Sequence, residues 1–265
     1  MLTSAVRSTS PFLAHASMCR WLCSARGEGL DPLSHRAVSV HSVNYRIYGG
    51  IWWRRFIRAA ADWIHPDAFG SVPARECLEA AWDVQQDIEE AIMRRRELTV
   101  ITADYQKFFD TFDADFFAHL CINIGIPARV ANLVKSVNLN MRRVVKIGPS
   151  FGVPFSVNIG AGQGDSFSVI CALAITTIQF RLMNHLHPTD DITFRGSRED
   201  VVNAVRTALE FDTVVCLKNQ LDKFVAISTM PDSRTILKET EFNGRCIRVA
   251  LDDALAGCPP LYSLD

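Results

Sequence analysis

Three aspartates are the side chains of this sequence best suited to chemistry on phosphates. Asp190 and Asp191 are adjacent and precede the strand-like segment 192–194, and Asp104 follows the apolar segment 98–103. Adjacent carboxylates at a strand end repel each other unless a cation neutralises them. Carboxylate oxygens are the ligands that Mg²⁺ prefers in proteins. The three aspartates therefore predict a two-metal site for phosphoryl transfer.

A glycine-rich turn lies between these aspartates in the sequence. Gly162 and Gly164 lack a Cβ, so the backbone can approach a ligand closely there. Gln163 between them offers both a hydrogen-bond donor and an acceptor. Taken alone, the turn is more typical of a plain strand-to-helix connection with Asp165 or Ser166 as the helix N-cap.

The aspartates also have plain structural explanations. Asp104 and Asp110 are candidate helix caps, because capping is a common use of Asp. The pair at 190–191 fits a solvated turn, and the pair Asp252-Asp253 shows that adjacent acids occur in this chain without any motif around them. An unrelated metal-dependent phosphohydrolase would need further carboxylate or His ligands near the pair. His185 and His187 are close in the sequence, but we expect them to be exposed, because no Cys or third His lies at ligand spacing.

The composition is that of a globular protein without a marked charge. The chain has 265 residues, of which 48% are hydrophobic and 22% are charged, so it can bury a sizeable core. A net charge of −1 gives no support by itself to a nucleic-acid partner. Local clusters of basic residues fit either phosphate contacts or solvated helix faces: Arg54, Arg55 and Arg58; Arg94, Arg95 and Arg96; Arg142, Arg143 and Lys146.

The cysteines and the hydropathy pattern bear on the compartment. Eight cysteines are scattered along the chain, and Cys121, Cys171 and Cys216 lie in apolar stretches, where we expect small buried side chains. This usage favours a reducing, intracellular compartment and does not distinguish nucleus from cytoplasm. No stretch approaches the roughly 18 apolar residues of a membrane span, so we expect no membrane partner.

The expected elements place the motifs in an α+β fold. Apolar residues recur at helical spacing or in short β-branched runs, bounded by Gly, Pro and Asp. The pattern predicts antiparallel strands with helices packed on one face. The helices are expected over 51–64, 76–96, 113–124, 128–139, 166–183 and 199–214, and the strands over 98–103, 143–147, 153–159, 192–194, 223–228 and 247–251, with a turn at 195–197.

The order of the three motifs resembles the palm of a reverse transcriptase, most closely that of non-LTR retrotransposons. The motifs are Asp104-x-x-Lys107-x-Phe109-Asp110, then the turn from Gly162 to Ser168, then Asp190-Asp191. Flanking segments resemble the same family: 35–40 the fingers, 66–70 a loop, 219–223 an Asn-to-Lys segment, and 243–247 with the Gly257 region a primer-grip hairpin.

This resemblance implies a right-hand polymerase palm with part of the fingers over residues 35–257. Residues 1–34 are then an irregular or truncated N-terminal segment, 258–265 form a tail, and no thumb is expected. The departures from the family are Pro188-Thr189, where it has an aromatic and a small residue, and Gly162, where it usually has Arg. Pro cannot donate to a strand ladder, which weakens the strand expected before the Asp pair.

The resemblance also assigns the metal and the proton chemistry. Asp104, Asp190 and Asp191 would hold two Mg²⁺ ions, or Mn²⁺ in their place. The ions would activate a primer 3′-hydroxyl and stabilise the leaving pyrophosphate. Lys223 would lie near the pyrophosphate as a proton donor. These four residues are the expected catalytic set.

Substrate contacts follow from the same resemblance. Arg36 would grip triphosphate oxygens, for which a guanidinium is well shaped. Phe109 would be the steric gate against a ribose 2′-hydroxyl, and Gln163 and Gly164 would line the incoming nucleotide and the template base. The implied function is an RNA-directed DNA polymerase with an RNA template, a DNA primer and deoxynucleoside triphosphates. The alternative is a catalytically inactive, truncated retroelement remnant with at most weak nucleic-acid binding.

Overall fold

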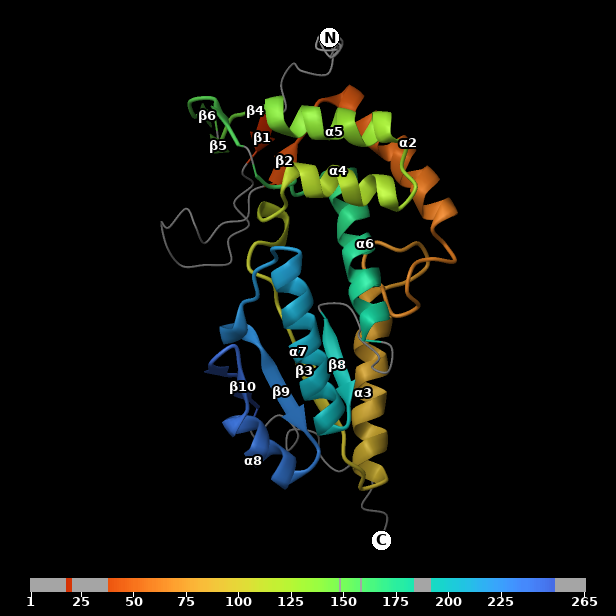
Figure 1. Ribbon diagram of the computed structural model, residues 1–265, viewed down its shortest axis with the longest axis vertical. Coiled ribbons are helices and arrows are strands. Elements are labelled where there is room, and N and C mark those ends of the chain that lie inside the picture. The colour runs from red at the N-terminus through yellow and green to blue at the C-terminus, as the bar shows by residue number, and fades with distance from the viewer. Residues whose placement is uncertain (1–17, 21–37, 148, 158, 184–191, 251–265) are drawn as a thin grey trace, which may run out of the picture. The chain divides into compact units, whose positions relative to one another are not determined.

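The computed structural model describes residues 18–20, 38–147, 149–157, 159–183 and 192–250 (Figure 1). The chain folds into two compact units, and each is made of two stretches of sequence. Unit 1 combines Met1–Ile64 with Lys107–Ile175, and unit 2 combines His65–Gln106 with Thr176–Asp265. The architecture is mixed α+β, as the sequence predicts.

Unit 2 is built on a four-stranded sheet. Its strand order is β12 (Arg248–Val249), β9 (Val225–Ser228), β3 (Thr99–Thr102) and β8 (Thr193–Gly196). The central strand β3 runs antiparallel to β8 and β9, which confirms the predicted antiparallel pairing. The outermost strand β12 pairs in parallel with β9, which the pattern did not predict.

Helices cover both faces of this sheet, whereas the sequence pattern predicted one. On one face, α3 (Cys77–Met93) brings Val84, Ile88 and Ala91 against Val100 of β3. On the other face lies α7 (Arg198–Val214), as Figure 1 shows. The reason lies in β3 itself, where Thr99, Val100 and Ile101 are all buried. A strand buried on both sides needs cover on both.

Local signals explain where α7 begins and ends. The Ser197 hydroxyl accepts a hydrogen bond from the Asp200 backbone N–H and caps the helix. At the other end Cys216 has φ +60°, and the Leu217 N–H returns to the Asp212 carbonyl. Cys216 is therefore exposed at a helix end, and the prediction that it is buried is wrong. The turn predicted over 195–197 is shorter than expected. Strand β8 runs to Gly196 and α7 starts at Arg198, so only Ser197 lies between them.

A helix and a hairpin follow β9. Helix α8 (Pro231–Glu239) starts with proline at its first turn, and the sequence pattern did not single it out. The hairpin joins β10 (Glu241–Phe242) to β11 (Arg245–Cys246). Asn243 and Gly244 between the strands both have positive φ, which Asn-Gly tolerates in a tight hairpin turn. A hairpin therefore exists where the resemblance predicted one.

Unit 1 is mainly helical. It contains α2 (Val43–Ala59), α4 (Ala114–Asn123), α5 (Ala128–Asn140) and the first ten residues of α6 (Ser166–Leu182). Helix α2 starts well before the predicted residue 51, because Ser42 accepts a hydrogen bond from the Tyr45 N–H and caps it there. The largest fully buried side chains of the unit include Phe117, Phe167, Ile170 and Val134.

Short strands complete unit 1. Met18–Arg20 (β1) pairs with Val38–Val40 (β2), although the sequence pattern predicted an irregular segment over 1–34. The predicted hairpin after α5 is present as two nested ladders. In them β4 (Arg142–Arg143) pairs with β7 (Phe155–Ser156), and β5 (Lys146–Ile147) pairs with β6 (Ser150–Phe151).

Candidate active site

Asp104 lies just beyond the end of β3 in unit 2, and backbone hydrogen bonds fix the segment that carries it. The Asp104 carbonyl accepts from the Gln220 N–H at 2.9 Å, and the Gln106 N–H donates to the Lys218 carbonyl at 2.7 Å. Tyr105 and Asn219 form an isolated antiparallel bridge between these two segments. Residues 104–106 and 218–220 are therefore held side by side.

Lys223 forms an ion pair with Asp104. Its Nζ lies 2.8 Å from Asp104 Oδ2, and both side chains are about half exposed, at 54% and 47%. A pair this exposed contributes at most about 1 kcal/mol to folding. Stability therefore does not explain why a carboxylate and an ammonium meet at a strand end. The structure brings together these two residues of the predicted catalytic set.

Asp190 and Asp191 lie outside the described residues, and so does Arg36. The described chain resumes at Ile192, whose carbonyl accepts from the Ala103 N–H at 3.0 Å. Thr193 is opposite Thr102 in the same antiparallel ladder. The residue directly after the aspartate pair thus lies across from the residue directly before Asp104.

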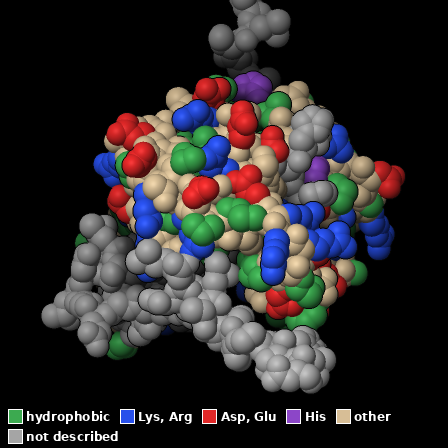
Figure 2. Space-filling view, turned by 90° about the horizontal axis from the view of Figure 1, so that it is seen from below, with side chains coloured by type: hydrophobic (Ala, Val, Ile, Leu, Met, Phe, Trp, Pro, Cys, Tyr) green, Lys and Arg blue, Asp and Glu red, His purple; other side chains and the backbone are tan. Residues whose placement is uncertain are grey.

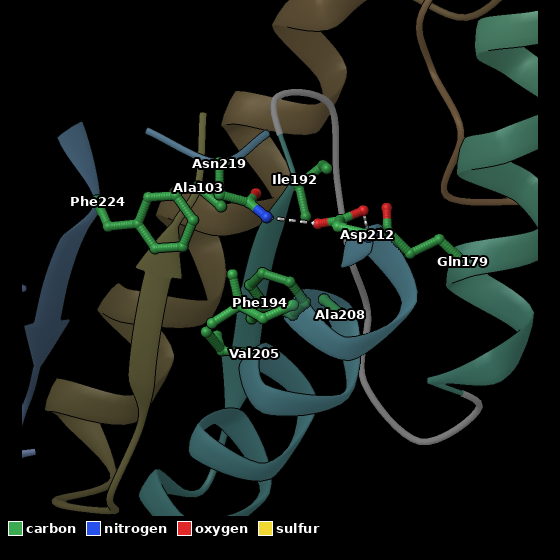
Figure 3. A pocket seen from close by; sticks show the side chains of 10 residues that line it. Ala103, Gln179, Ile192, Phe194, Val205, Ala208, Asp212, Asn219 and Phe224 are labelled. Carbon is green, nitrogen blue, oxygen red and sulfur yellow. Dashed lines mark hydrogen bonds between the residues drawn. The ribbon is translucent and has the colours of Figure 1, made fainter. Parts of the chain in front are cut away.

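A buried carboxylate, Asp212, lies at the end of α7 in the same unit. Asp212 is 2% exposed and accepts hydrogen bonds from three side chains. The donors are the Tyr105 hydroxyl at 3.0 Å, Gln179 Nε2 at 3.1 Å and Asn219 Nδ2 at 2.9 Å. Figure 3 shows Asn219 and Gln179 pointing at Asp212 from opposite sides. These four residues are referred to below as the Asp212 network.

Burial dominates the electrostatics of this network. It raises the pKa of Asp212 to about 6, although hydrogen bonds from Asn219, Tyr105 and Gln179 act in the opposite direction. Burial also raises the pKa of Tyr105, followed by the charge of Asp212. The adjoining cavity of about 10 Å³ is at the lower limit for one water molecule, so it is no ligand pocket.

Sequence analysis missed Asp212, although a signal for it exists. The buried positions of α7 include Val201, Val205, Ala208 and Asp212, which recur at three- and four-residue spacing. A carboxylate on the apolar face of a helix is costly unless it is hydrogen-bonded. The helical spacing of the apolar residues would therefore predict buried hydrogen-bond partners for Asp212.

In unit 1, Phe109 contacts the glycine-rich turn through its backbone. The Ala161 N–H donates to the Phe109 carbonyl at 2.7 Å, and the Ser39 N–H donates to the Gln163 carbonyl at 2.8 Å. Gly164 is exposed with φ +95°. The structure therefore holds Phe109, Gln163 and Gly164 in one region of unit 1.

Phe109 is half-buried in an aromatic cluster. Its ring lies edge-on to Phe108, with centroids 5.3 Å apart, and to Phe112 at 6.4 Å. Asp110, a candidate cap for the following helix, lies instead in a short 3-10 turn, Phe108–Asp110. The cap of α4 is Asp113, which accepts from the N–H groups of Asp115 and Phe116.

Gly162 stands where the resembled family usually has arginine, and its surroundings explain the glycine. A Cβ at this position would lie 2.9 Å from Ser39 Oγ and 3.0 Å from His41 Nε2. Both distances are shorter than a normal van der Waals contact. An arginine would need the segment with Ser39 and His41 to move away.

Replacing Gly162 by Ala is expected to destabilise the chain by about 1–3 kcal/mol, as overpacking of a tight site does. Urea unfolding with a far-ultraviolet signal measures the loss. Gly152 is the matched control, because it also lies outside the helices and a Cβ there makes only ordinary contacts, the shortest at 3.6 Å to the Val145 carbonyl oxygen. Equal stability of the Gly162→Ala and Gly152→Ala chains would show that the close approach at Gly162 carries no cost.

Asp165 at the start of α6 is a second buried carboxylate. It is 3% exposed, and its oxygens accept from the Tyr45 hydroxyl at 3.1 Å and the Phe167 N–H at 3.3 Å. The N-cap role predicted for Asp165 is thereby confirmed. Burial is the main cause that raises the pKa of Asp165 to about 6. The buried pair of Tyr45 and Asp165 ties α2 to the turn with Gln163.

No protein-family model and no curated protein matches the sequence. Two solved structures of telomerase from Candida tropicalis match the fold. A complex with a fragment of telomeric RNA matches at TM-score 0.52 and 13% identity, covering 71% of this chain and 34% of the telomerase chain. An apo form truncated from its C-terminal domain matches at 0.51 and 12%, covering 73% and 48%.

The fold is similar to that of telomerase, an enzyme related to reverse transcriptases. At this identity the likeness concerns the fold alone. The chain spans between a third and a half of the telomerase chains that it matches. The fold expected from the motif order is thus confirmed at the level of a mixed α+β, reverse-transcriptase-like architecture.

The basic clusters of this telomerase-like fold differ in their partners. Arg94 and Arg96 both pair with Glu90, and Arg55 lies 5.2 Å from the Trp52 ring. Arg142 is exposed on β4. Side chains of both charges are interspersed over the described part of the face in Figure 2. The charges of Arg94 and Arg96 therefore have a structural explanation.

Two further observations concern metals and membranes. Within the described ranges, no group of three or more His, Cys, Asp or Glu side chains lies close enough to hold a metal ion. Among the helices of those same ranges, none combines the length and the apolar character that crossing a bilayer requires. Of the three aspartates predicted to bind metal, Asp104 lies within the described residues.

Proposed function

We propose that this chain is the palm, with part of the fingers, of an RNA-directed DNA polymerase. The order of its motifs favours the type found in non-LTR retrotransposons. The observation that carries the proposal is the Asp104–Lys223 pair beyond the end of β3, in a reverse-transcriptase-like fold. One of the telomerase structures contains RNA, which supports a nucleic-acid partner.

The donor set fits a divalent metal. Asp104 is half exposed and offers hard oxygens, and it already attracts a cation, the Lys223 ammonium at 2.8 Å. Ile192, which follows Asp190-Asp191 in the sequence, accepts a hydrogen bond from the N–H of Ala103, which precedes Asp104. These three aspartates would hold Mg²⁺. Bound there, it would lower the pKa of the primer hydroxyl and offset charge on the triphosphate.

The side chains of the chain have separate tasks in this proposal. The ammonium of Lys223 would face the leaving phosphates as a proton donor, and Asp104 would be among the residues that hold the metal. Arg36 binds phosphate oxygens. Gln163 and Gly164 line the nucleotide, where the positive φ of Gly164 exposes backbone to a ligand.

Primer extension tests the proposed reaction directly. The purified chain is incubated with a DNA primer annealed to an RNA template, deoxynucleoside triphosphates and Mg²⁺, and products are separated by length. Template-directed extension that needs all four components is the expected result. Binding of the primer–template without any extension would favour the alternative of an inactive remnant.

Replacing Phe109 by Ala is expected to raise ribonucleotide incorporation relative to deoxynucleotide incorporation by at least about tenfold. The reason is steric, because the proposed gate would no longer occupy the space of a 2′-hydroxyl. The measurement is the ratio of kcat/KM for the two nucleotides. Phe108→Ala is the matched control, since Phe108 belongs to the same aromatic cluster. An equal change of the ratio in both variants would contradict a gating role for Phe109.

A further inference from the structure

The Asp212 network joins four segments of unit 2. Asp212 lies in the last turn of α7, Gln179 belongs to α6, Tyr105 follows β3, and Asn219 precedes the short 3-10 turn Leu221–Lys223. The two oxygens of the Asp212 carboxylate accept a hydrogen bond from each of the other three residues. The network is therefore a single junction, and its loss would release several segments at once.

Two of these segments carry the residues of the candidate site. Tyr105 is the immediate neighbour of Asp104 in the chain, and Asn219 lies four residues before Lys223. The Asp104 carbonyl accepts from the Gln220 N–H, and the Lys223 N–H donates to the Gln220 carbonyl. The Asp104–Lys223 distance thus depends on how residues 104–106 and 218–220 are anchored.

Two polar side chains of the Asp212 network are buried, and burying polar groups costs free energy of folding. Asp212 is 2% exposed and Gln179 is fully buried, in the midst of apolar side chains such as Phe194 and Phe224 (Figure 3). Apolar groups of similar volume usually fill such a place at no loss of stability. Hydrogen bonds, unlike apolar contacts, fix the direction as well as the distance between two side chains, which gives a reason for a polar network at this place.

We propose that Asp212 is a positioning residue that holds Tyr105 and Asn219 together and thereby sets the geometry of Asp104 and Lys223. It acts through these neighbours and touches no reacting atom. The inference deepens the proposed polymerase function and rests on it for its catalytic consequence. The structural part of the proposal, that Asp212 holds Tyr105 and Asn219 together, does not depend on polymerase activity and is argued from the four side chains of the network alone.

Asn219→Asp is the variant that breaks the junction with the smallest change in shape. It replaces the donating amide by a second carboxylate 2.9 Å from Asp212, and at the pH of about 9 used for the measurements below the two carboxylates are ionised and repel each other. The swap variant Asp212→Asn/Asn219→Asp restores the contact. Its new amide at position 212 donates to the new carboxylate at position 219, and its oxygen still accepts from Tyr105 and Gln179.

Amide hydrogen exchange measures how firmly the segments around Tyr105 and Asn219 are held, and it needs no enzymatic reaction. In Asn219→Asp, amide exchange over residues 104–107 and 217–224 is expected to be at least about tenfold faster, because the Gln106 and Gln220 N–H groups lose their fixed partners. The swap variant is expected to return exchange to within about threefold of the original chain. Unchanged exchange in Asn219→Asp, or no recovery in the swap variant, would overturn the proposal.

Primer extension then tests the catalytic consequence. Asn219→Asp is expected to lower kcat by about ten- to a hundredfold with little change in KM, since the reacting groups are misplaced while substrate contacts remain. The swap variant should recover kcat, and Glu210→Gln, an exposed acid on the same helix, should not change it. Full kcat in an Asn219→Asp chain with fast exchange would overturn the positioning role. If the original chain extends no primer, the polymerase proposal is refuted. Amide hydrogen exchange in the Asn219→Asp and swap variants then decides by itself whether Asp212 anchors the two segments.

Discussion

Replacing Asp104 by Asn is expected to reduce the rate of primer extension at least about a thousandfold, equivalent to about 4 kcal/mol of lost transition-state stabilisation. The amide keeps the shape of the side chain but removes its charge and one oxygen donor. It can no longer hold a divalent cation or balance Lys223, which lies 2.8 Å away. The measurement is single-turnover extension at saturating nucleotide and Mg²⁺.

The fold should survive this substitution. Asp104 is 47% exposed, and its ion pair with Lys223 contributes at most about 1 kcal/mol. The backbone bond from Gln220 to the Asp104 carbonyl does not involve the side chain. A loss of activity with an unchanged unfolding midpoint would therefore be chemical in origin.

Asp222→Asn is the matched control for Asp104→Asn. Asp222 lies directly before Lys223, and its carboxylate is 77% exposed and 3.3 Å from Arg245 Nη1. Removing this charge leaves Asp104 intact, so extension is expected to change by less than about threefold. Equal losses in the two variants would indicate a general effect of negative charge in this region and would contradict a specific role for Asp104.

The sequence predicted the parts of the fold that depend on local signals. The β-branched run 98–103 is the central strand β3, and the helical spacing over 76–96 is α3. Asp104 lies at a strand end for the same reason, because its position follows from where the apolar run stops. The family resemblance placed Asp104 and Lys223 in one catalytic set, but their ion pair is seen only in the structure, and no local pattern contains it.

Features that depend on distant contacts could not be predicted in this way. The Asp212 network requires the register of four segments separated by up to 114 positions, from Tyr105 to Asn219. The close approach of Ser39 to Gly162 likewise follows from packing and not from either segment alone. The covered second face of the sheet shows the same limit, since the burial of Val100 depends on α3.

The second large effect concerns stability and pH. Replacing Asp165 by Asn is expected to stabilise the chain by about 2 kcal/mol at pH 8 and to leave it nearly unchanged at pH 4. Burial is the main cause that raises the pKa of Asp165 to about 6, from a usual value of 3.8. The ionised carboxylate is thus disfavoured in the folded chain above that pH.

The sign of the pH dependence follows from proton binding. Below pH 3.8 the carboxyl is protonated in the folded and the unfolded chain, and its contribution to stability is complete. Between about pH 4 and 6 the folded chain keeps a proton that the unfolded chain has released, so stability falls as the pH rises. Above about pH 6 the loss is complete. Asn has no proton to release, so the variant lacks this slope.

Asn also preserves the contacts of Asp165. Its oxygen can accept from the Phe167 N–H, and its amide can donate to the Tyr45 hydroxyl, which then turns to accept. Asn is as good an N-cap as Asp, so the start of α6 is retained. The expected gain is therefore the relief of a buried charge, without the loss of a hydrogen bond.

Urea unfolding at a series of pH values from 4 to 8 measures this difference. The stability of Asp165→Asn minus that of the original chain should rise through about pH 4 to 6 and then level off. Asp62→Asn is the control in the same unit, because Asp62 is exposed and its loss should change stability by less than about 0.5 kcal/mol. A variant that is less stable than the original chain at pH 8 would show that the ionised Asp165, through Tyr45 and the N-terminus of α6, stabilises the fold by more than its burial disfavours it.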